Sequence, residues 1–254
     1  MNTQNPIPLY VGITDFLYAS QVRDMGDLVP PSHRRSLMNG FMMSYKVFNG
    51  LPSRWRDVWI PSERLYRVCV DEYQKVFNAL HWADYEGLTT IEDLFMVCQN
   101  CGLYLNALQL DMIWPAPVLL DDFAAVAKIP LILQIGANAL EAVGNDPVRM
   151  LKLVNERRIH GVLLDKSMGR GKGMEAAVLR PFVEILFKER PDLRIAVAGG
   201  LGPDTLDLVK PLMDEFPDLS IDAQGKLRPS GSALDPVDWG MAGKYLSKAL
   251  SMFP

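Results

Sequence analysis

Eight short apolar segments alternate with helical patterns along the chain, and this alternation restricts the possible folds more than any other feature of the sequence. The apolar segments cover residues 9–13, 37–43, 78–83, 107–112, 131–135, 161–165, 195–198 and 219–222. Helical patterns lie between them, for example at residues 63–76 and 174–189. Strands that alternate with helices are typical of βαβ units and a parallel sheet. Eight such units predict an α/β fold of the (β/α)8 TIM barrel type.

Glycine turns follow the last two predicted strands. Gly199 and Gly200 end the seventh strand, and Gly225 follows the eighth. Glycine permits positive φ angles and close backbone approach, so the N–H groups of such turns can face an anion. Pro203 is expected to open the helix after the first turn. Because (β/α)8 barrels often hold a phosphate with the loops after strands 7 and 8, these three glycines are predicted phosphate-binding residues.

Length and charge limit the class of protein. The 254 residues suit one barrel domain over residues 1–254, since such barrels contain about 250 residues. With 26 basic and 30 acidic residues the net charge is −4, which gives no broad attraction for nucleic acid or an anionic membrane. The N-terminal segment lacks a signal-peptide pattern, and no apolar segment reaches the roughly 20 residues of a membrane span. We therefore expect a cytoplasmic protein without nucleic-acid or membrane partners.

The three cysteines follow no disulfide or metal-binding pattern. Cys98 and Cys101 form a CxxC pair, but the chain contains no second pair of ligands. We therefore expect two buried thiols in a helix turn, no disulfide and no metal site.

The segment 44–61 after the second strand is too long for an ordinary βα connection. Loops of this length are usually functional or disordered, and Phe48, Trp55 and Trp59 favour an ordered one because disordered segments contain few aromatic residues. Two interpretations remain open: a lid over the carboxyl end of the barrel, or an insertion that packs on a neighbouring helix.

Residues at the carboxyl ends of the strands are the candidates for chemistry, since the active sites of these barrels lie there. They are Thr14, Asp15, Lys46, His81, Asp84, Asp111, Gln134, Asp165, Lys166 and Asp222. Carboxylates that converge at one mouth repel one another, and burial raises the pKa of at least one of them into a range useful for proton transfer. Asp165 is the favoured catalytic residue because it ends an apolar strand and the glycine-rich segment KSMGRGKG follows it. The alternative is that Asp165 caps the following turn.

Six motifs occur in the order and at the spacing of one enzyme family. They are VGIT, GFMM, LNALQLD, LLDKSMGRGKG, AVAGGLGPD and IDAQG. They resemble the motifs of phosphoribosylanthranilate isomerases, barrels that catalyse the Amadori rearrangement of an N-linked ribose phosphate. VGIT resembles that family's CGIT, and LLD followed by GRGK resembles its acidic strand end with a glycine-rich loop. Only residues from about 29 to 61 have no counterpart.

The resemblance implies roles for several residues. Asp165 would be the general acid that protonates the ribose ring oxygen, and Asp222 would contact the substrate's amine. Gly199, Gly200 and Gly225 would hold the phosphate through their backbone amides. Arg56, with Arg54 as the alternative, would bind the anthranilate carboxylate. Apart from the resemblance, Gln134 at a strand end and Lys172 in the glycine-rich segment, which could fold over a substrate phosphate, are further candidates for substrate binding. The resemblance implies no cofactor.

Two positions depart from the family pattern. Val11 stands where the family has its cysteine base, and Asp111 stands where it has a histidine. Valine cannot accept a proton, and the loss of a positioned base typically slows proton transfer by about 10²- to 10⁴-fold. His81, Asp111 or Asp15 would have to replace it. His81 has a suitable ordinary pKa, although a buried structural role is the alternative.

Three functions are compatible with the sequence. The first is a phosphoribosylanthranilate isomerase-like protein that binds a phosphorylated sugar, with altered activity because of Val11. The second is a divergent phosphosugar epimerase, aldolase or lyase, and the third is a noncatalytic barrel that binds a phosphorylated ligand. Fold does not decide among them, because one superfold serves many chemistries. In each case we expect a monomer or a homodimer.

Overall fold

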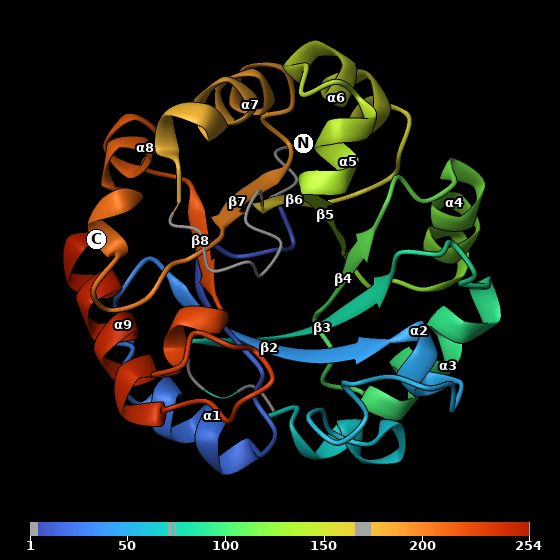
Figure 1. The fold of residues 1–254 in the computed structure, drawn as a ribbon, viewed down its shortest axis with the longest axis horizontal. Coiled ribbons are helices and arrows are strands. Elements are labelled where there is room, and N and C mark those ends of the chain that lie inside the picture. The colour runs from blue at the N-terminus through green and yellow to red at the C-terminus, as the bar shows by residue number, and fades with distance from the viewer. Residues whose placement is uncertain (1–4, 71–72, 74, 166–173, 254) are drawn as a thin grey trace.

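A closed barrel of eight parallel strands forms the centre of the molecule in the computed structural model, which describes residues 5–70, 73, 75–165 and 174–253 (Figure 1). The strands are β1 (Tyr10–Thr14), β2 (Ser36–Ser44), β3 (Val76–Asp84), β4 (Ala107–Met112), β5 (Leu131–Gly136), β6 (Gly161–Asp165), β7 (Arg194–Ala198) and β8 (Ser220–Ala223). Each strand pairs with the next, and β8 pairs with β1. The predicted (β/α)8 barrel is confirmed, with strand ends within two residues of those expected.

Helices surround the strands as an outer ring (Figure 1). They are α1 (Ala19–Gly26), α2 (Tyr45–Phe48), η1 (Ser62–Arg67), α3 (Ile91–Cys101), α4 (Pro117–Val126), α5 (Ala137–Ala142), α6 (Pro147–Asn155), α7 (Ala176–Glu189), η2 (Leu206–Leu208), α8 (Lys210–Glu215), η3 (Gly225–Leu227) and α9 (Trp239–Met252). The helix predicted at residues 174–189 is confirmed as α7. Cys98 and Cys101 are free, buried thiols on α3, as expected.

The helix predicted at residues 63–76 is wrong. Among the described residues of this stretch, only η1, a short 3₁₀ helix, forms, and Val76 already belongs to β3. The side chain of Asn78 binds the backbone of Val70, since it accepts a hydrogen bond from Val70 N (3.3 Å) and donates one to Val70 O (2.8 Å). Asn39 donates to Val68 O in the same way (3.0 Å). These long-range hydrogen bonds replace the helical ones.

Pro203 does not open a helix either. It lies in a turn before η2, and α8 begins with Pro211 in its first turn. The hydroxyl of Thr205 donates to the carbonyl of Gly200 at 2.7 Å and closes the turn. Such side-chain hydrogen bonds compete with helix formation. The anion-binding potential of this loop therefore depends on its own amides and not on a helix terminus.

Alternation along the strands separates two hydrophobic cores, because successive side chains of a strand point to opposite faces. The outer core lies between the strands and the helices and contains Val11, Ile13 and their equivalents on the other strands. The inner core fills the barrel near the amino ends of the strands, with Tyr10, Met38 and Phe77 among its members. Polar side chains occupy the inner face nearer the carboxyl ends. The fold thus places its polar interior at one mouth.

The insertion after β2 packs on the side of the barrel. Phe48 contacts Trp82 of β3 edge-on, with ring centroids 5.5 Å apart, and Trp55 stacks on Trp59 at 4.8 Å. Trp59 is buried near Asp15 at the end of β1. None of the described residues in the insertion lines the pocket at the mouth. The packed insertion is therefore favoured over the lid.

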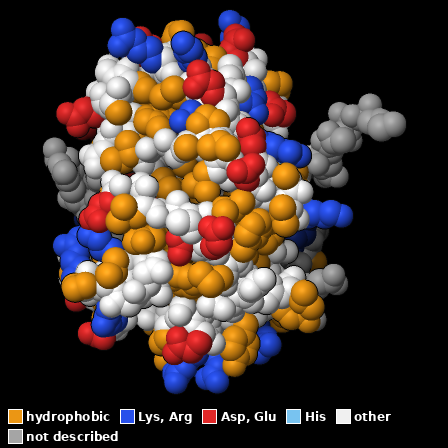
Figure 2. Space-filling model, turned by 90° about the vertical axis from the view of Figure 1, so that its right-hand side faces the viewer, with side chains coloured by type: hydrophobic (Ala, Val, Ile, Leu, Met, Phe, Trp, Pro, Cys, Tyr) orange, Lys and Arg blue, Asp and Glu red, His pale blue; other side chains and the backbone are white. Residues whose placement is uncertain are grey.

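Figure 2 shows the face of the molecule that lies on the right of Figure 1. Acidic, basic and hydrophobic side chains are interspersed on it, without a continuous basic region. Among the described residues, no helix is long and apolar enough to cross a membrane.

Candidate active site

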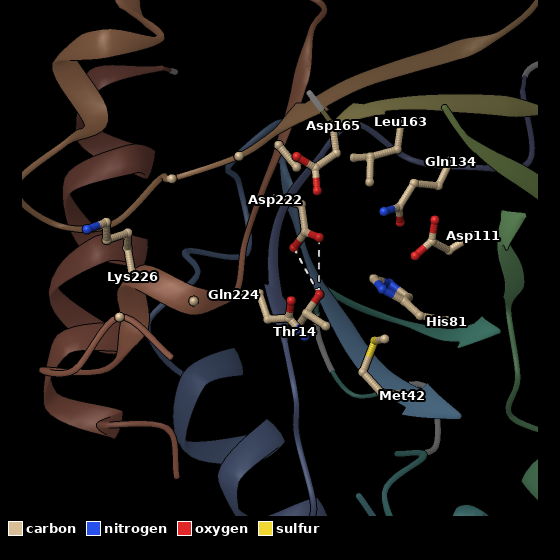
Figure 3. Close-up of a pocket in the computed structure, with 15 residues that line it drawn as sticks. Thr14, Met42, His81, Asp111, Gln134, Leu163, Asp165, Asp222, Gln224 and Lys226 are labelled. Carbon is tan, nitrogen blue, oxygen red and sulfur yellow. Dashed lines mark hydrogen bonds between the residues drawn. The ribbon is translucent and has the colours of Figure 1, made fainter. Parts of the chain in front are cut away.

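A pocket opens at the carboxyl end of the barrel, where every strand contributes a residue (Figure 3). Its space amounts to about 650 Å³ when the part open to solvent is included. The residues that line it are Thr14, Met42, His81, Asp111, Gln134, Leu163, Asp165, Ala198, Gly199, Gly200, Asp222, Gln224, Gly225, Lys226 and Gly231. Six of the candidates from the strand ends therefore meet in one pocket: Thr14, His81, Asp111, Gln134, Asp165 and Asp222.

Three carboxyl groups point into this pocket (Figure 3). Burial raises the pKa of Asp222 to about 8; the hydroxyl of Thr14, 3.1 Å from both carboxyl oxygens, opposes the shift, and the charge of Asp165 adds to it. Burial raises the pKa of Asp111 to about 7, against a hydrogen bond from the Tyr85 hydroxyl. The predicted rise in carboxyl pKa is confirmed for both groups. At neutral pH Asp222 is thus mainly protonated, and Asp111 exchanges readily between its two forms.

Gly12 gives Asp222 the room that it occupies. A Cβ atom on Gly12 would lie 2.4 Å from Asp222 Oδ1 and 2.7 Å from Met38 Cε. Contacts that short require one partner to move. The glycine of the VGIT motif is therefore part of the site, although it has no side chain.

His81 is buried at the bottom of the pocket. Its Nδ1 lies 3.2 Å from Gln109 Nε2, and the same amide donates to Gln134 Oε1 at 2.8 Å. Burial lowers the pKa of His81 to about 3. The expectation that His81 titrates near neutral pH is thus wrong, because the imidazole is shielded from water and no carboxylate shifts its pKa upward.

The predicted phosphate-binding glycines lie in two adjoining loops. Gly199 and Gly200 have φ angles of 114° and 65°, a region that side chains rarely tolerate. Gly202 packs against the other loop, since a Cβ atom on it would be 2.7 Å from the carbonyl oxygen of Lys226. Lys226 is one of the residues that line the pocket, and its side chain forms no ion pair with any described residue. The two loops therefore combine backbone amides with one available cation.

A buried ion pair holds the loop after β8. Arg228 donates to Asp15 Oδ2 and to the carbonyl of Gln224, and the Gln224 amide donates to the same Asp15 oxygen at 3.0 Å. Both charged groups are almost fully buried. Burial raises the pKa of Asp15, and Arg228 opposes the shift. Asp15 is thus a structural residue beside the pocket and not a free base.

Other candidates lie outside the pocket. Lys46 pairs with Glu86 on the surface, and Asp84 accepts hydrogen bonds from its own loop, including one from Thr89 N at 2.7 Å. Arg56 donates to the carbonyls of Gly50 (2.5 Å) and Leu51 (2.7 Å). The assignment of Arg56 to a substrate carboxylate is therefore corrected, because the guanidinium group is used within its own loop.

Three further basic residues were candidates for the site: Arg54, Lys166 and Lys172. Arg54 lies over the ring of Trp55, 5.0 Å from its centroid, and does not line the pocket either. Lys166 and Lys172 lie outside the described residues.

Val11 does not face the pocket, which corrects its assignment to the base position. It is fully buried in the outer core, whereas Tyr10, Gly12 and Thr14 of the same strand face the interior. In a strand, adjacent residues occupy opposite faces. A side chain at position 11 therefore cannot reach the reacting atoms.

The Val11→Cys variant is accordingly expected to gain no activity on phosphoribosylanthranilate. Its thiol would be enclosed between β1 and the helices, away from substrate. The assay is compared with the reaction of the folded variant toward a thiol reagent, which is expected to be as slow as that of the wild type. A gain in turnover together with a reactive new thiol would contradict the outward orientation of residue 11.

Several residues of the site were missed by sequence reasoning. Tyr85 donates to Asp111, Gln109 contacts His81, and Lys226 extends the glycine turn. Gln109 had a detectable signal, because it precedes Asp111 by two residues and so shares its inward face. The hydrogen bond between Tyr85 and Asp111 gave no such signal, because it joins the residue after β3 to a residue of β4 that lies 26 positions further along the chain.

The raised carboxyl pKa values predict how stability depends on pH. The folded chain binds more protons at Asp111 and Asp222 than the unfolded chain between about pH 4 and about pH 8, so these groups lower the free energy of unfolding as pH rises through that range. One unit in pKa corresponds to about 1.4 kcal/mol. Between pH 5 and pH 8 the free energy of unfolding should decline less in Asp222→Asn than in the wild type. The difference between the two declines should exceed about 1.4 kcal/mol. Equal declines in denaturant unfolding would contradict the Asp222 assignment.

Comparisons with known proteins agree with the barrel. The chain is similar to phosphoribosylanthranilate isomerase from Thermotoga maritima, with a TM-score of 0.62 and 18% identity over 95% of this chain and 99% of that one. The isomerase from Thermococcus kodakaraensis has a TM-score of 0.59 and 14% identity over 96% and 98% of the two chains. TrpF from Jonesia denitrificans has a TM-score of 0.55 and 17% identity over 96% and 98%. No family model matches the chain, and no curated protein matches its sequence. At these identities the similarity establishes the fold alone.

Proposed function

We propose that this chain is a divergent relative of the phosphoribosylanthranilate isomerases that binds a phosphorylated sugar and catalyses an isomerisation of the aldose–ketose type by acid–base chemistry. The observation that carries the proposal is the pocket itself. It combines carboxyl groups whose pKa values are about 7 and about 8 with two glycine loops and an unpaired lysine. The fold that the chain shares with those isomerases supports the same assignment.

The carboxyl groups suit the two proton transfers of such a reaction. An acid first protonates the ring oxygen as the sugar ring opens. A base then removes the proton from the carbon next to the carbonyl or imine carbon, while the carbonyl oxygen or imine nitrogen takes up a proton. The resulting enol or enamine is protonated at the former carbonyl or imine carbon as the neighbouring hydroxyl loses its proton. Asp111 is the proposed base, because a pKa of about 7 leaves part of it ionised at neutral pH. Asp165 is the proposed acid at ring opening, as the family resemblance implies, and the protonated Asp222 is a second donor.

The phosphate is assigned to the loops after β7 and β8. Gly199, Gly200 and Gly225 would offer backbone amides, and Lys226 would supply a charge. An ionised group makes hydrogen bonds that are stronger than neutral ones. With this assignment the phosphate would lie at one side of the pocket and the carbons of the sugar would lie near the carboxyl groups.

The proposal does not specify anthranilate as the aglycone of the sugar. Among the described residues, neither Arg54 nor Arg56 lines the pocket. The proposal therefore names phosphorylated sugars as a class, and we expect slow turnover of phosphoribosylanthranilate. A divergent phosphosugar epimerase, aldolase or lyase is the second candidate, since it would use the same cradle and the same carboxyl groups without an aglycone.

Calorimetric titration with ribulose 5-phosphate tests the proposed phosphate site. Lys226→Gln is expected to weaken binding by about 10-fold or more, since a hydrogen bond to a charged group is worth about 1.5–3 kcal/mol. Lys244→Gln is the control, because Lys244 is exposed on α9 and does not line the pocket. Inorganic phosphate should compete with the sugar. Equal affinities of the two variants would contradict the phosphate site, and absence of binding to the wild type would contradict the proposed function.

A further inference from the structure

One polar atom in the pocket has no partner. His81 Nε2 is buried and makes no hydrogen bond with any described residue. Buried polar groups nearly always have a partner, so an exception calls for an explanation. The ring lies between Asp111 and Thr14 and points into the pocket (Figure 3).

The contacts of the other ring nitrogen fix where the proton lies. The Gln109 amide group donates to Gln134 Oε1, and its nitrogen also faces His81 Nδ1. Because an NH₂ group only donates, Nδ1 must present its lone pair. A neutral imidazole has one N–H, which is therefore on Nε2. The hydrogen bonds that link Gln134, Gln109 and His81 thus select the tautomer that directs an N–H into the site.

Gly40 on β2 lies next to this N–H and has no side chain that could cover it. A Cβ atom on Gly40 would lie 3.2 Å from His81 Nε2 and 2.6 Å from Thr14 Oγ1. Thr14 in turn donates to Asp222. The imidazole N–H, the threonine hydroxyl and the protonated carboxyl group therefore gather around one part of the pocket.

We propose that His81 is a neutral hydrogen-bond donor whose Nε2–H binds a hydroxyl or carbonyl oxygen of the phosphorylated sugar. This inference rests on the proposed function and deepens it, since it assigns a catalytic group and requires a ligand with an acceptor oxygen at that point. When a base removes a proton from carbon, negative charge develops on the neighbouring oxygen. A donor fixed beforehand in a water-poor site stabilises that charge.

The low pKa of His81 agrees with this role. Burial lowers the pKa to about 3, so the ring stays neutral at the pH of any ordinary assay. A neutral imidazole can donate its N–H to the oxygen as a hydrogen bond and still keep the proton. Asp111 on β4 and Asp222 on β8 are titratable groups that line the same pocket as the ring, and the proton transfers are assigned to the carboxyl groups.

Nitrogen NMR of the protein with ¹⁵N-labelled histidine tests the tautomer without any ligand. Of the three histidines, the signals of His81 are those missing in His81→Gln. They are expected to show the Nε2–H tautomer unchanged from about pH 5 to about pH 9. In Gln109→Glu a carboxylate would face Nδ1, so the proton should move to Nδ1. A wild-type signal for Nδ1–H, or titration near pH 6.5, would overturn the proposal.

Turnover of ribulose 5-phosphate tests the contact with the ligand. His81→Leu is expected to lower kcat by about 10²- to 10³-fold with a smaller effect on KM, as loss of a donor to a developing oxyanion does. His81→Gln keeps an N–H donor, so its kcat should fall less than that of His81→Leu. Unchanged kcat in His81→Leu would overturn the donor role while the proposed function stands. If the wild type binds no phosphosugar, the proposed function fails together with the donor role, whereas the tautomer result remains a separate finding.

Discussion

Replacing Arg228 by methionine is expected to lower the free energy of unfolding by about 3–5 kcal/mol, because it leaves a buried charge without its partner. Asp15 would keep only the Gln224 amide as a hydrogen-bond donor to Oδ2. The guanidinium also donates to the carbonyls of Gln224 (2.6 Å) and Asp235 (2.6 Å), which would lose their donor. Denaturant unfolding of the purified variant measures the effect, and the loop after β8 should lose phosphosugar affinity with it.

Two comparisons make this prediction specific. Lys210→Met breaks the exposed pair with Asp214, and exposed pairs contribute about 0–1 kcal/mol. The double variant Arg228→Met with Asp15→Asn removes both buried charges and keeps a residue type that tolerates the φ angle of 88° at position 15, so it should recover part of the lost stability. If Arg228→Met were no more destabilising than Lys210→Met, the ion pair would not hold this loop.

Replacing Gly12 by alanine is expected to lower turnover by at least about 10²-fold, since a displacement of about 1 Å in a catalytic group has an effect of that size. The new methyl group would meet Asp222 Oδ1 at 2.4 Å and Met38 Cε at 2.7 Å. Asp222 would have to leave its place beside Thr14. Overpacking typically destabilises by about 1–3 kcal/mol as well, so kcat and unfolding are measured on the same preparation.

Gly243→Ala is the matched control for this substitution. Its Cβ atom would meet Leu28 Cδ1 at 3.5 Å, an ordinary contact. In a helix, alanine is favoured over glycine by about 0.5–1 kcal/mol. The control should therefore keep its activity and unfold no more easily than the wild type. Full activity in Gly12→Ala would show that Asp222 does not need its present position.

The barrel was predictable from the sequence because it depends on local patterns. Short apolar runs between helical segments placed all eight strands, and the ends of these strands gave most of the pocket. The failure at residues 63–76 has a long-range cause. Asn39 and Asn78 hold that segment with hydrogen bonds that a helical pattern cannot reveal.

The error at Val11 shows the limit of a motif without its strand register. A shift of one residue along a strand moves a side chain to the other face. The motif VGIT placed Val11 at the mouth, while the structure places Gly12 and Thr14 there. Inward alternation from Thr14 would have predicted this face, since Tyr10, Gly12 and Thr14 differ by two residues.

The partners of the site residues could not be read from the sequence. Asp15 and Arg228 are 213 positions apart, and His81 and Gln109 are separated by 28. Closure of the barrel brings these pairs together. The pKa values of Asp111 and Asp222 depend on that closure too, because burial is their main cause.

Proton exchange in D₂O tests the central claim most directly. Ribose 5-phosphate, ribulose 5-phosphate and phosphoribosylanthranilate are incubated separately with the protein, and NMR follows deuterium at carbons 1 and 2 of the sugar. We predict that at least one of the three gains deuterium and is isomerised, and that Asp111→Asn abolishes the exchange. Binding of these compounds without exchange, or exchange that persists in Asp111→Asn, would contradict acid–base isomerisation by this pocket.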